Sequence, residues 1–182
     1  IDATCNHIPY TYTPQHIQGS EAMIENGDKP LLQIVPQQKA DASIDSLAYQ
    51  YHLQGDALAG KATYQLRGDM KEWFMSIIDD AGNKNSDDIL ANNLNADTHN
   101  MTVSDVKWTD QDARHEWARF TGNVVNKPAV QQMDGEIYIE LNPHNNLFDN
   151  RIDTTGRSND YYFPVRCNIV RQASLLIPTG YK

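Results

Sequence analysis

Cysteine is almost absent from the 182-residue chain, which contains only Cys5 and Cys167. Two cysteines cannot build the dense disulfide framework of a small secreted domain, and their separation does not fit the ligand spacing of a zinc site. A chain of this length buries enough apolar surface to fold without either aid. We expect Cys167 to be a buried structural thiol, because it lies on the apolar side of an alternating run.

Basic residues and long apolar runs are also scarce. Lys and Arg number 15 against 24 Asp and Glu, which gives a formal net charge of −9 and disfavours a role in binding nucleic acid. No run of about 18 apolar residues exists, so the sequence predicts no membrane-spanning helix. Neither a glycine-rich phosphate loop nor a nucleophile elbow is present. Because the chain begins at Ile1 without an initiator methionine, we expect it to be a piece of a longer polypeptide.

Glutamate is rare as well, with 6 residues against 18 Asp and 16 Asn. Asp and Asn favour turns, whereas Glu favours helix interiors, so this bias indicates strands joined by many turns. Two alternating runs around Gly55, at residues 47–53 and 58–66, predict a β-hairpin. Further strand-like runs follow in the second half of the chain, at residues 102–109, 115–125, 137–141 and 163–177.

Arg171 alone interrupts the alternation of the last run, and we expect a bulge or bend there. The runs do not alternate with helices as β-α-β units would. The sequence therefore predicts a mainly β fold, an antiparallel β-sandwich-like domain with one or two short helices.

The first helix is expected to start at Asp69, which stands three residues before Glu72 at the spacing of a capping box. Five apolar residues after it share one helical stripe, which predicts a core-facing side: Met70, Trp73, Phe74, Ile77 and Ile78. A second short helix is expected from Ser86, with acidic residues near the positive end of its dipole. The polar stretch at residues 37–43 suggests a domain boundary, with residues 1–38 before it and residues 39–182 after it.

Three groups of residues could carry chemistry. His7 and His16 lie near Cys5 in a proline-rich loop, where a metal cluster or a Cys–His pair is conceivable, but histidines that pack the loop fit the spacing better. Residues 79–88 are rich in acid; they are a solvated surface or, less readily, a calcium loop without the closing glutamate. Four aromatic residues are core or cross-strand residues or, alternatively, a sugar-stacking platform: Trp108, Trp117, Tyr161 and Tyr162.

Several short motifs are similar in order and spacing to a known arrangement. Asp2 and Thr4 form an Asp-x-Thr motif, followed by a proline-punctuated loop that ends at residues 18–22. A hairpin motif follows at residues 53–60 and 67–68. The last motifs lie at residues 135–139, 142–143, 148, 157, 162–165 and 177–181. This order resembles the C-terminal part of bacterial exported transglutaminase-like proteins.

The resemblance implies that residues 1–38 are the end of a transglutaminase-like α+β core and that residues 39–182 are a β-rich accessory domain. Asp2 would be the last member of a Cys-His-Asp triad whose Cys and His lie upstream, where it orients the histidine. The parent would be a cysteine protease or amidase-type protein that acts on peptide or amide bonds. The segment alone would be non-catalytic and would need no cofactor or metal.

The partner implied by the resemblance is the upstream catalytic domain of the same parent chain. The location implied is the periplasm or cell surface of a Gram-negative bacterium. A second hypothesis remains open, in which the chain is an independent β-sandwich module that binds a glycan or a protein at the cell envelope.

Overall fold

The computed structural model describes residues 5–82, 85–95, 100–141, 158 and 166–180. Its centre is the predicted hairpin, formed by β3 (Ile44–Gln54) and β4 (Ala57–Arg67). The two strands pair without interruption from Ile44↔Arg67 to Gln54↔Ala57. Gly55 closes the turn with a φ of 62°, a conformation that glycine adopts without a steric penalty. The hairpin expected from the sequence is confirmed.

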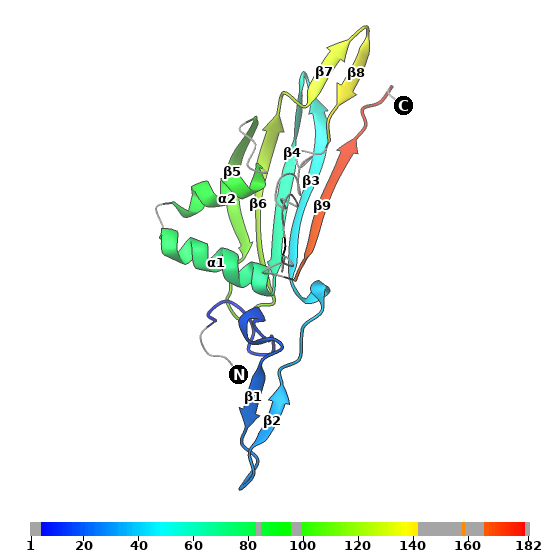
Figure 1. Cartoon of the computed structure of the whole chain (residues 1–182). Helices are drawn as coiled ribbons and strands as arrows, with labels where there is room; N and C mark the ends of the chain where they lie inside the picture. Colours follow the sequence, from blue (N-terminus) through cyan, green and yellow to red (C-terminus); the bar gives the residue numbers. More distant parts are fainter. Residues whose placement is uncertain (1–4, 83–84, 96–99, 142–157, 159–165, 181–182) are drawn as a thin grey trace.

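Three further strands extend this hairpin into a five-stranded sheet with the order β5-β6-β4-β3-β9. They are β5 (Met101–Asp110), β6 (Trp117–Asn126) and β9 (Asn168–Leu176). Neighbouring strands are antiparallel except for β9, which runs parallel to β3 along the outer edge of the sheet (Figure 1). The prediction of a mainly β fold with short helices is confirmed.

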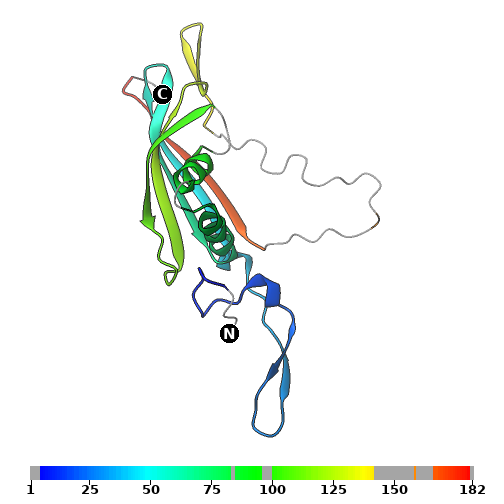
Figure 2. The same ribbon diagram turned by 90° about the vertical axis from the view of Figure 1, so that its left-hand side faces the viewer.

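Two helices cover one face of this sheet, α1 (Asp69–Ala81) and α2 (Ser86–Leu94) (Figure 2). In the described part of the chain the second layer is therefore helical, where the sequence suggested a second sheet. The reason lies in the opposite face, where paired residues such as Gln50, Lys61 and Asn123 are polar and exposed. A sheet that is apolar on one side only can bury only one layer.

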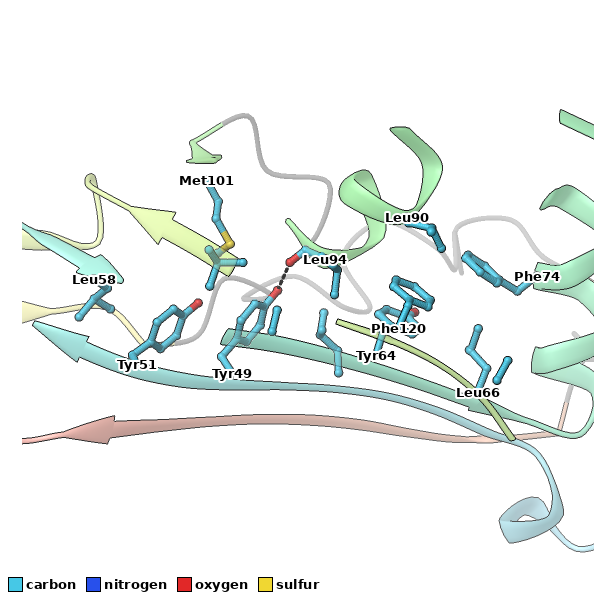
Figure 3. Close-up of a cluster of buried hydrophobic side chains, with 14 of the residues drawn as sticks. Tyr49, Tyr51, Leu58, Tyr64, Leu66, Phe74, Leu90, Leu94, Met101 and Phe120 are labelled. Atoms are coloured by element: carbon cyan, nitrogen blue, oxygen red, sulfur yellow. Dashed lines mark hydrogen bonds between the residues drawn. The ribbon is translucent and has the colours of Figure 1, made fainter. Parts of the chain in front are cut away.

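The core lies between the sheet and the helices, and stacked aromatic rings form its centre. The ring of Phe120 lies 5.2 Å from that of Tyr64 and 5.4 Å from that of Phe74, while Trp108 meets Phe120 edge-on at 5.3 Å. Tyr64, Phe74 and Phe120 come from β4, α1 and β6, and Figure 3 shows them gathered under the helices. The predicted apolar stripe of α1 is only partly confirmed, because Trp73 is 60% exposed.

Helix α2 rests on a position of the sheet where the residues are small. Leu94 is fully buried, and a Cβ atom added to Gly122 of β6 would lie only 2.8 Å from its Cδ1 atom. Ala62, the partner of Gly122 on β4, is also fully buried. The hydroxyl of Tyr49 donates a hydrogen bond of 3.0 Å to the carbonyl oxygen of Leu94, drawn in Figure 3, so the helix end is held by packing and by a polar contact.

Two small hairpins lie outside the main sheet. One consists of β1 (Glu21–Ile24) and β2 (Leu31–Ile34), and the other of β7 (Val130–Met133) and β8 (Glu136–Ile139). They extend from opposite ends of the molecule in Figure 1. Two 3-10 turns, η1 (Gln15–Ile17) and η2 (Ala40–Ala42), lie in the N-terminal segment.

The bulge expected at Arg171 is absent. β9 keeps a continuous register with β3 from Asn168 to Leu176, so the arginine side chain stays on the helix side of the strand. Its Nη1 atom lies 2.8 Å from Oδ1 of Asp45 and 3.0 Å from the Asp45 carbonyl oxygen, and its guanidinium lies over the ring of Tyr64. An ion pair and a cation–π contact therefore accommodate the charge without a change of backbone.

Lys71 is the least expected residue of the core. It is fully buried in the first turns of α1, and its Nζ atom donates to the carbonyl oxygens of Asp112, Ala113 and His115 at 3.1, 3.2 and 2.6 Å. Burial lowers the pKa of this lysine, which nearby acidic groups partly oppose. The ammonium group joins α1 to the loop between β5 and β6.

Replacement of Lys71 by Met tests this role. We expect the free energy of unfolding to fall by about 2 kcal/mol, because three partly buried carbonyl groups lose a charged donor. Urea unfolding followed by circular dichroism measures the change. The control is Lys107→Met, at an exposed position of β5. Equal losses in the two variants would contradict a special role for Lys71.

Candidate functional site

The acidic residues at the start of α1 bind the N-terminal segment of the chain instead of capping the helix. Gly68 occupies the N-cap position and provides no side-chain cap, so the predicted capping box does not form. The carboxylate of Asp69 instead accepts hydrogen bonds from the Tyr12 hydroxyl at 2.6 Å and from the Gln15 amide at 3.0 Å. Burial and the nearby Asp69 raise the pKa of Tyr12, so its hydroxyl stays protonated and donates.

Glu72 and Asp79 complete this attachment. The two carboxylate oxygens of Glu72 accept hydrogen bonds from the backbone amides of Asn6 and His7, at 3.1 and 2.7 Å. About two turns further along α1, Oδ2 of Asp79 lies 2.7 Å from Nε2 of His7, whose side chain is largely buried. We call Asp69, Glu72 and Asp79 the acidic clamp, since all three side chains of α1 bind residues 6–15.

The clamp gives His7 a packing role. Its backbone amide and its ring both bind α1, so it packs the loop against the helix, as the sequence analysis favoured. Its Nδ1 atom is buried and has no hydrogen-bond partner in the described part of the chain. Cys167 is a half-buried free thiol whose pKa is raised by burial, which fits a structural role.

Asp2, the predicted triad residue, lies outside the described residues, and so do Tyr161 and Tyr162 of the predicted aromatic platform. The two tryptophans of that platform are described, and the structure places them on opposite faces of the sheet. Trp108 is paired with the core residue Phe120, whereas Trp117 is paired with Arg67 on the open face. The ring of Trp117 lies within 5.6 Å of two arginine side chains. Trp108 and Trp117 therefore cannot form one stacking surface.

A shallow depression that is open to the surface, called the cavity below, lies where α1 ends and α2 begins and has a volume of about 490 Å³. It is lined by residues from both helices and by Trp108 and Gln111 from the region of β5. The remaining lining residues are Ile78, Asp79, Gly82, Ser86 and Asp87. An aromatic ring beside carboxylate, amide and hydroxyl groups is a combination that suits a ligand rich in hydroxyl groups.

The cavity unites features that the sequence analysis treated separately. The sequence analysis predicts that Trp108 is a core or cross-strand residue or, alternatively, part of an aromatic platform, and that residues 79–88 are a surface or a calcium loop. Only the packing of α2 on β5 and of α1 beside α2 brings them together, and no spacing in the sequence signals it. The described residues include no group of three His, Cys, Asp or Glu side chains arranged to hold a metal ion, so the calcium hypothesis gains no support.

The third feature of this end of the molecule is the apolar surface of hairpin β1–β2. Met23 is 72% exposed and Leu32, its cross-strand partner, is 67% exposed. Three other large apolar side chains of the hairpin are also exposed: Ile24, Leu31 and Ile34. A two-stranded hairpin of four-residue strands is barely stable in water by itself, and exposed apolar patches on proteins commonly mark interaction surfaces.

In comparisons with known proteins, no family model, curated protein or solved structure matches the chain. Neither of the two described α-helices has both the length and the apolar character that a membrane crossing would require.

Removal of one clamp carboxylate tests the attachment of the N-terminal segment. In Glu72→Ala the amides of Asn6 and His7 lose their acceptor, and we expect their hydrogen exchange to become about tenfold faster. Hydrogen–deuterium exchange with mass spectrometry measures this. Asp80→Ala is the control, because Asp80 is an exposed acidic residue of the same helix. Unchanged exchange in Glu72→Ala would show that the segment is held by other contacts.

Proposed function

We propose that this chain is the non-catalytic accessory segment of a transglutaminase-like cysteine hydrolase or acyltransferase, and that it packs on the catalytic core of the same parent protein. The observation that carries the proposal is the exposed apolar surface of hairpin β1–β2. The hairpin lies within residues 1–38, the stretch that resembles the end of such a core. Strands that are cut off from their own domain would show this exposure of apolar side chains on a short, isolated ladder.

The acidic clamp supports the same arrangement. It binds residues 6–15, which begin four positions after Asp2 in the sequence, to the first helix of the accessory domain. A core that ended in this segment would therefore be held at a defined place on α1. In such a parent protein Asp2 would orient the catalytic histidine, and the accessory domain would stabilise the strand end that carries it.

The proposal assigns peptide or amide-bond chemistry to the parent protein and only Asp2, at most, to this chain. The cysteine and histidine of the triad would come from the upstream domain. Export to the periplasm or the cell surface is part of the same proposal and is supported by the family resemblance alone.

Binding in trans tests the proposal. The upstream region of the parent polypeptide and this chain are produced separately, and their affinity is measured by calorimetry. We expect Met23→Ser/Leu32→Ser to weaken binding at least tenfold, because each serine removes apolar area from the contact. Met133→Ser/Tyr138→Ser is the matched control, since it changes two exposed apolar residues on hairpin β7–β8.

Two results would contradict the proposal. One is the absence of binding, or equal weakening by both pairs of substitutions. The other is thiol-dependent amidase or transglutaminase activity in the isolated chain, since the proposal leaves it without a nucleophile and a base.

The second candidate function is that of a glycan-binding module, and the cavity beside Trp108 favours it. The notable features are an aromatic side chain and two carboxylates in one hollow, a combination found where proteins hold hydroxyl-rich ligands. In this hypothesis the ligand is a glycan of the cell envelope. It does not require the upstream domain.

Titration of the full chain with a panel of soluble envelope oligosaccharides tests this second function, with binding followed by the tryptophan fluorescence of the protein. If the cavity binds one of them, Asp87→Asn should weaken the affinity about tenfold or more, by loss of a charged hydrogen-bond acceptor. Asp88→Asn is the control, because its neighbour Asp87 lines the cavity and Asp88 does not. A panel without any binding, or identical effects of the two variants, would reject the glycan hypothesis.

A further inference from the structure

Strand β9 forms one edge of the main sheet and is paired on one side only. It runs beside β3 for nine residues in unbroken register, and no other described strand pairs with its outer side. Figure 1 shows β9 along the outside of the sheet, on the side away from the helices. The backbone N–H and C=O groups of such an edge are positioned to pair with a further strand.

The opposite edge of the sheet has features that prevent such pairing. β5 shifts register twice against β6, between Ser104 and Lys107 and between Trp108 and Asp110. Asp105 has a φ of 50°, which turns the backbone out of the extended conformation. Irregular geometry and charged side chains on an edge are known protections against strand addition.

β9 keeps one register along its whole length and contains no proline or glycine. Its single charged residue, Arg171, points to the helix side of the sheet; an inward-pointing charge also discourages strand addition, but here the ion pair with Asp45 neutralises it. Both faces of the strand expose apolar side chains, including Ile169 and Val170, and Leu176 is 74% exposed. The helices pack on β3, β4, β5 and β6, so the helical layer ends before β9.

We propose that β9 is a dimerisation edge, at which it pairs antiparallel with β9 of a second copy of this chain. The register is centred on Gln172, so that the main sheets of the two copies form one continuous sheet of ten strands. In this register Ile169 lies opposite Leu175 of the second copy, and Val170 lies opposite Ser174. Arg171 lies opposite Ala173, so the two arginines do not face each other.

A second copy is the occupant that the residues of β9 themselves favour. On the helix side the strand reads Ile169, Arg171, Ala173, Leu175, a pattern of large, charged, small and large that is complementary to its own reverse. A two-fold axis requires this self-complementarity. If one residue of the first copy contacts a second residue of the other copy, the same two residues also meet with the copies exchanged. The edge also contributes no negative charge, so the chain's net charge of −9 is not concentrated at the contact.

The dimer is expected to depend on concentration. A single pair of strands buries less surface than a standard protein–protein interface of about 1,200–2,000 Å². The proposal goes beyond the proposed function and does not depend on it, because it concerns β9 and a second copy, whereas the catalytic core would bind at hairpin β1–β2.

Charge substitutions at one pair of facing positions test both the edge and the register. Val170→Lys/Ser174→Lys places two lysines opposite each other at both ends of the strand pair, and we expect sedimentation equilibrium to show a monomer. Val170→Lys/Ser174→Glu places lysine opposite glutamate at the same positions, and we expect a dimer again. Both variants lose the bond from the Ser174 hydroxyl to the Tyr49 carbonyl, so the comparison isolates the sign of the charge.

A crosslink provides evidence that does not depend on the stability of these variants. In a Cys5→Ser/Cys167→Ser background, Gln172→Cys puts a thiol on the two-fold axis, where facing Cβ atoms lie about 4.5–5.5 Å apart. We expect oxidation to give a disulfide-linked dimer. Gln50→Cys, exposed on the inner strand β3, is the control and should stay monomeric.

Three results would overturn the proposal. The wild-type chain could remain monomeric at high micromolar concentration, or the lysine–lysine variant could dimerise like the wild type. The third is a monomeric lysine–glutamate variant together with a Gln172→Cys chain that forms no crosslink.

Discussion

The ammonium group of Lys71 is the contact on which the arrangement of this molecule depends. A fully buried lysine is costly unless its charge is satisfied, and three carbonyl oxygens of residues 112–115 satisfy it here. These carbonyls belong to the loop between β5 and β6, so the bond fixes α1 relative to the outer strands of the sheet. With α1 fixed, Phe74 reaches the aromatic centre of the core, and the acidic clamp faces the N-terminal segment. One helix therefore connects the sheet, the cavity and the segment that precedes the sheet.

How far the sequence predicts this fold follows from the range of each interaction. The β3–β4 hairpin and both helices are governed by local patterns, namely alternation around Gly55 and a periodic apolar stripe, and they were predicted with small errors at their ends. The partner and direction of β9 were not predictable, since a parallel strand pair leaves no local signal. The capping box was wrong because Gly68, with a φ of 62°, takes the cap position and frees Asp69 for Tyr12.

The candidate site shows the same division. The acidic stretch and the strand tryptophan of the cavity were both visible in the sequence, yet their meeting depends on how α2 packs on β5 and α1 packs beside α2. Lys71 was equally invisible, because a lysine inside an amphipathic helix is normally assigned to the solvent side. The apolar stripe also misplaced the buried side of the helix. Trp73, which the stripe assigned to the core, is exposed, and the buried residues of α1 are Lys71, Phe74 and Met75.

The apolar surface of this molecule is divided between a covered core and exposed edges. The helices bury the inner face of its main sheet over β3, β4, β5 and β6, and the opposite face is largely polar. Exposed apolar side chains lie on hairpin β1–β2 and on the edge strand β9, which the helical layer does not cover. Both places are edges of their sheets in the described part of the chain. The apolar surface that the fold leaves uncovered therefore lies where backbone groups of a sheet edge are also exposed, on hairpin β1–β2 and on β9.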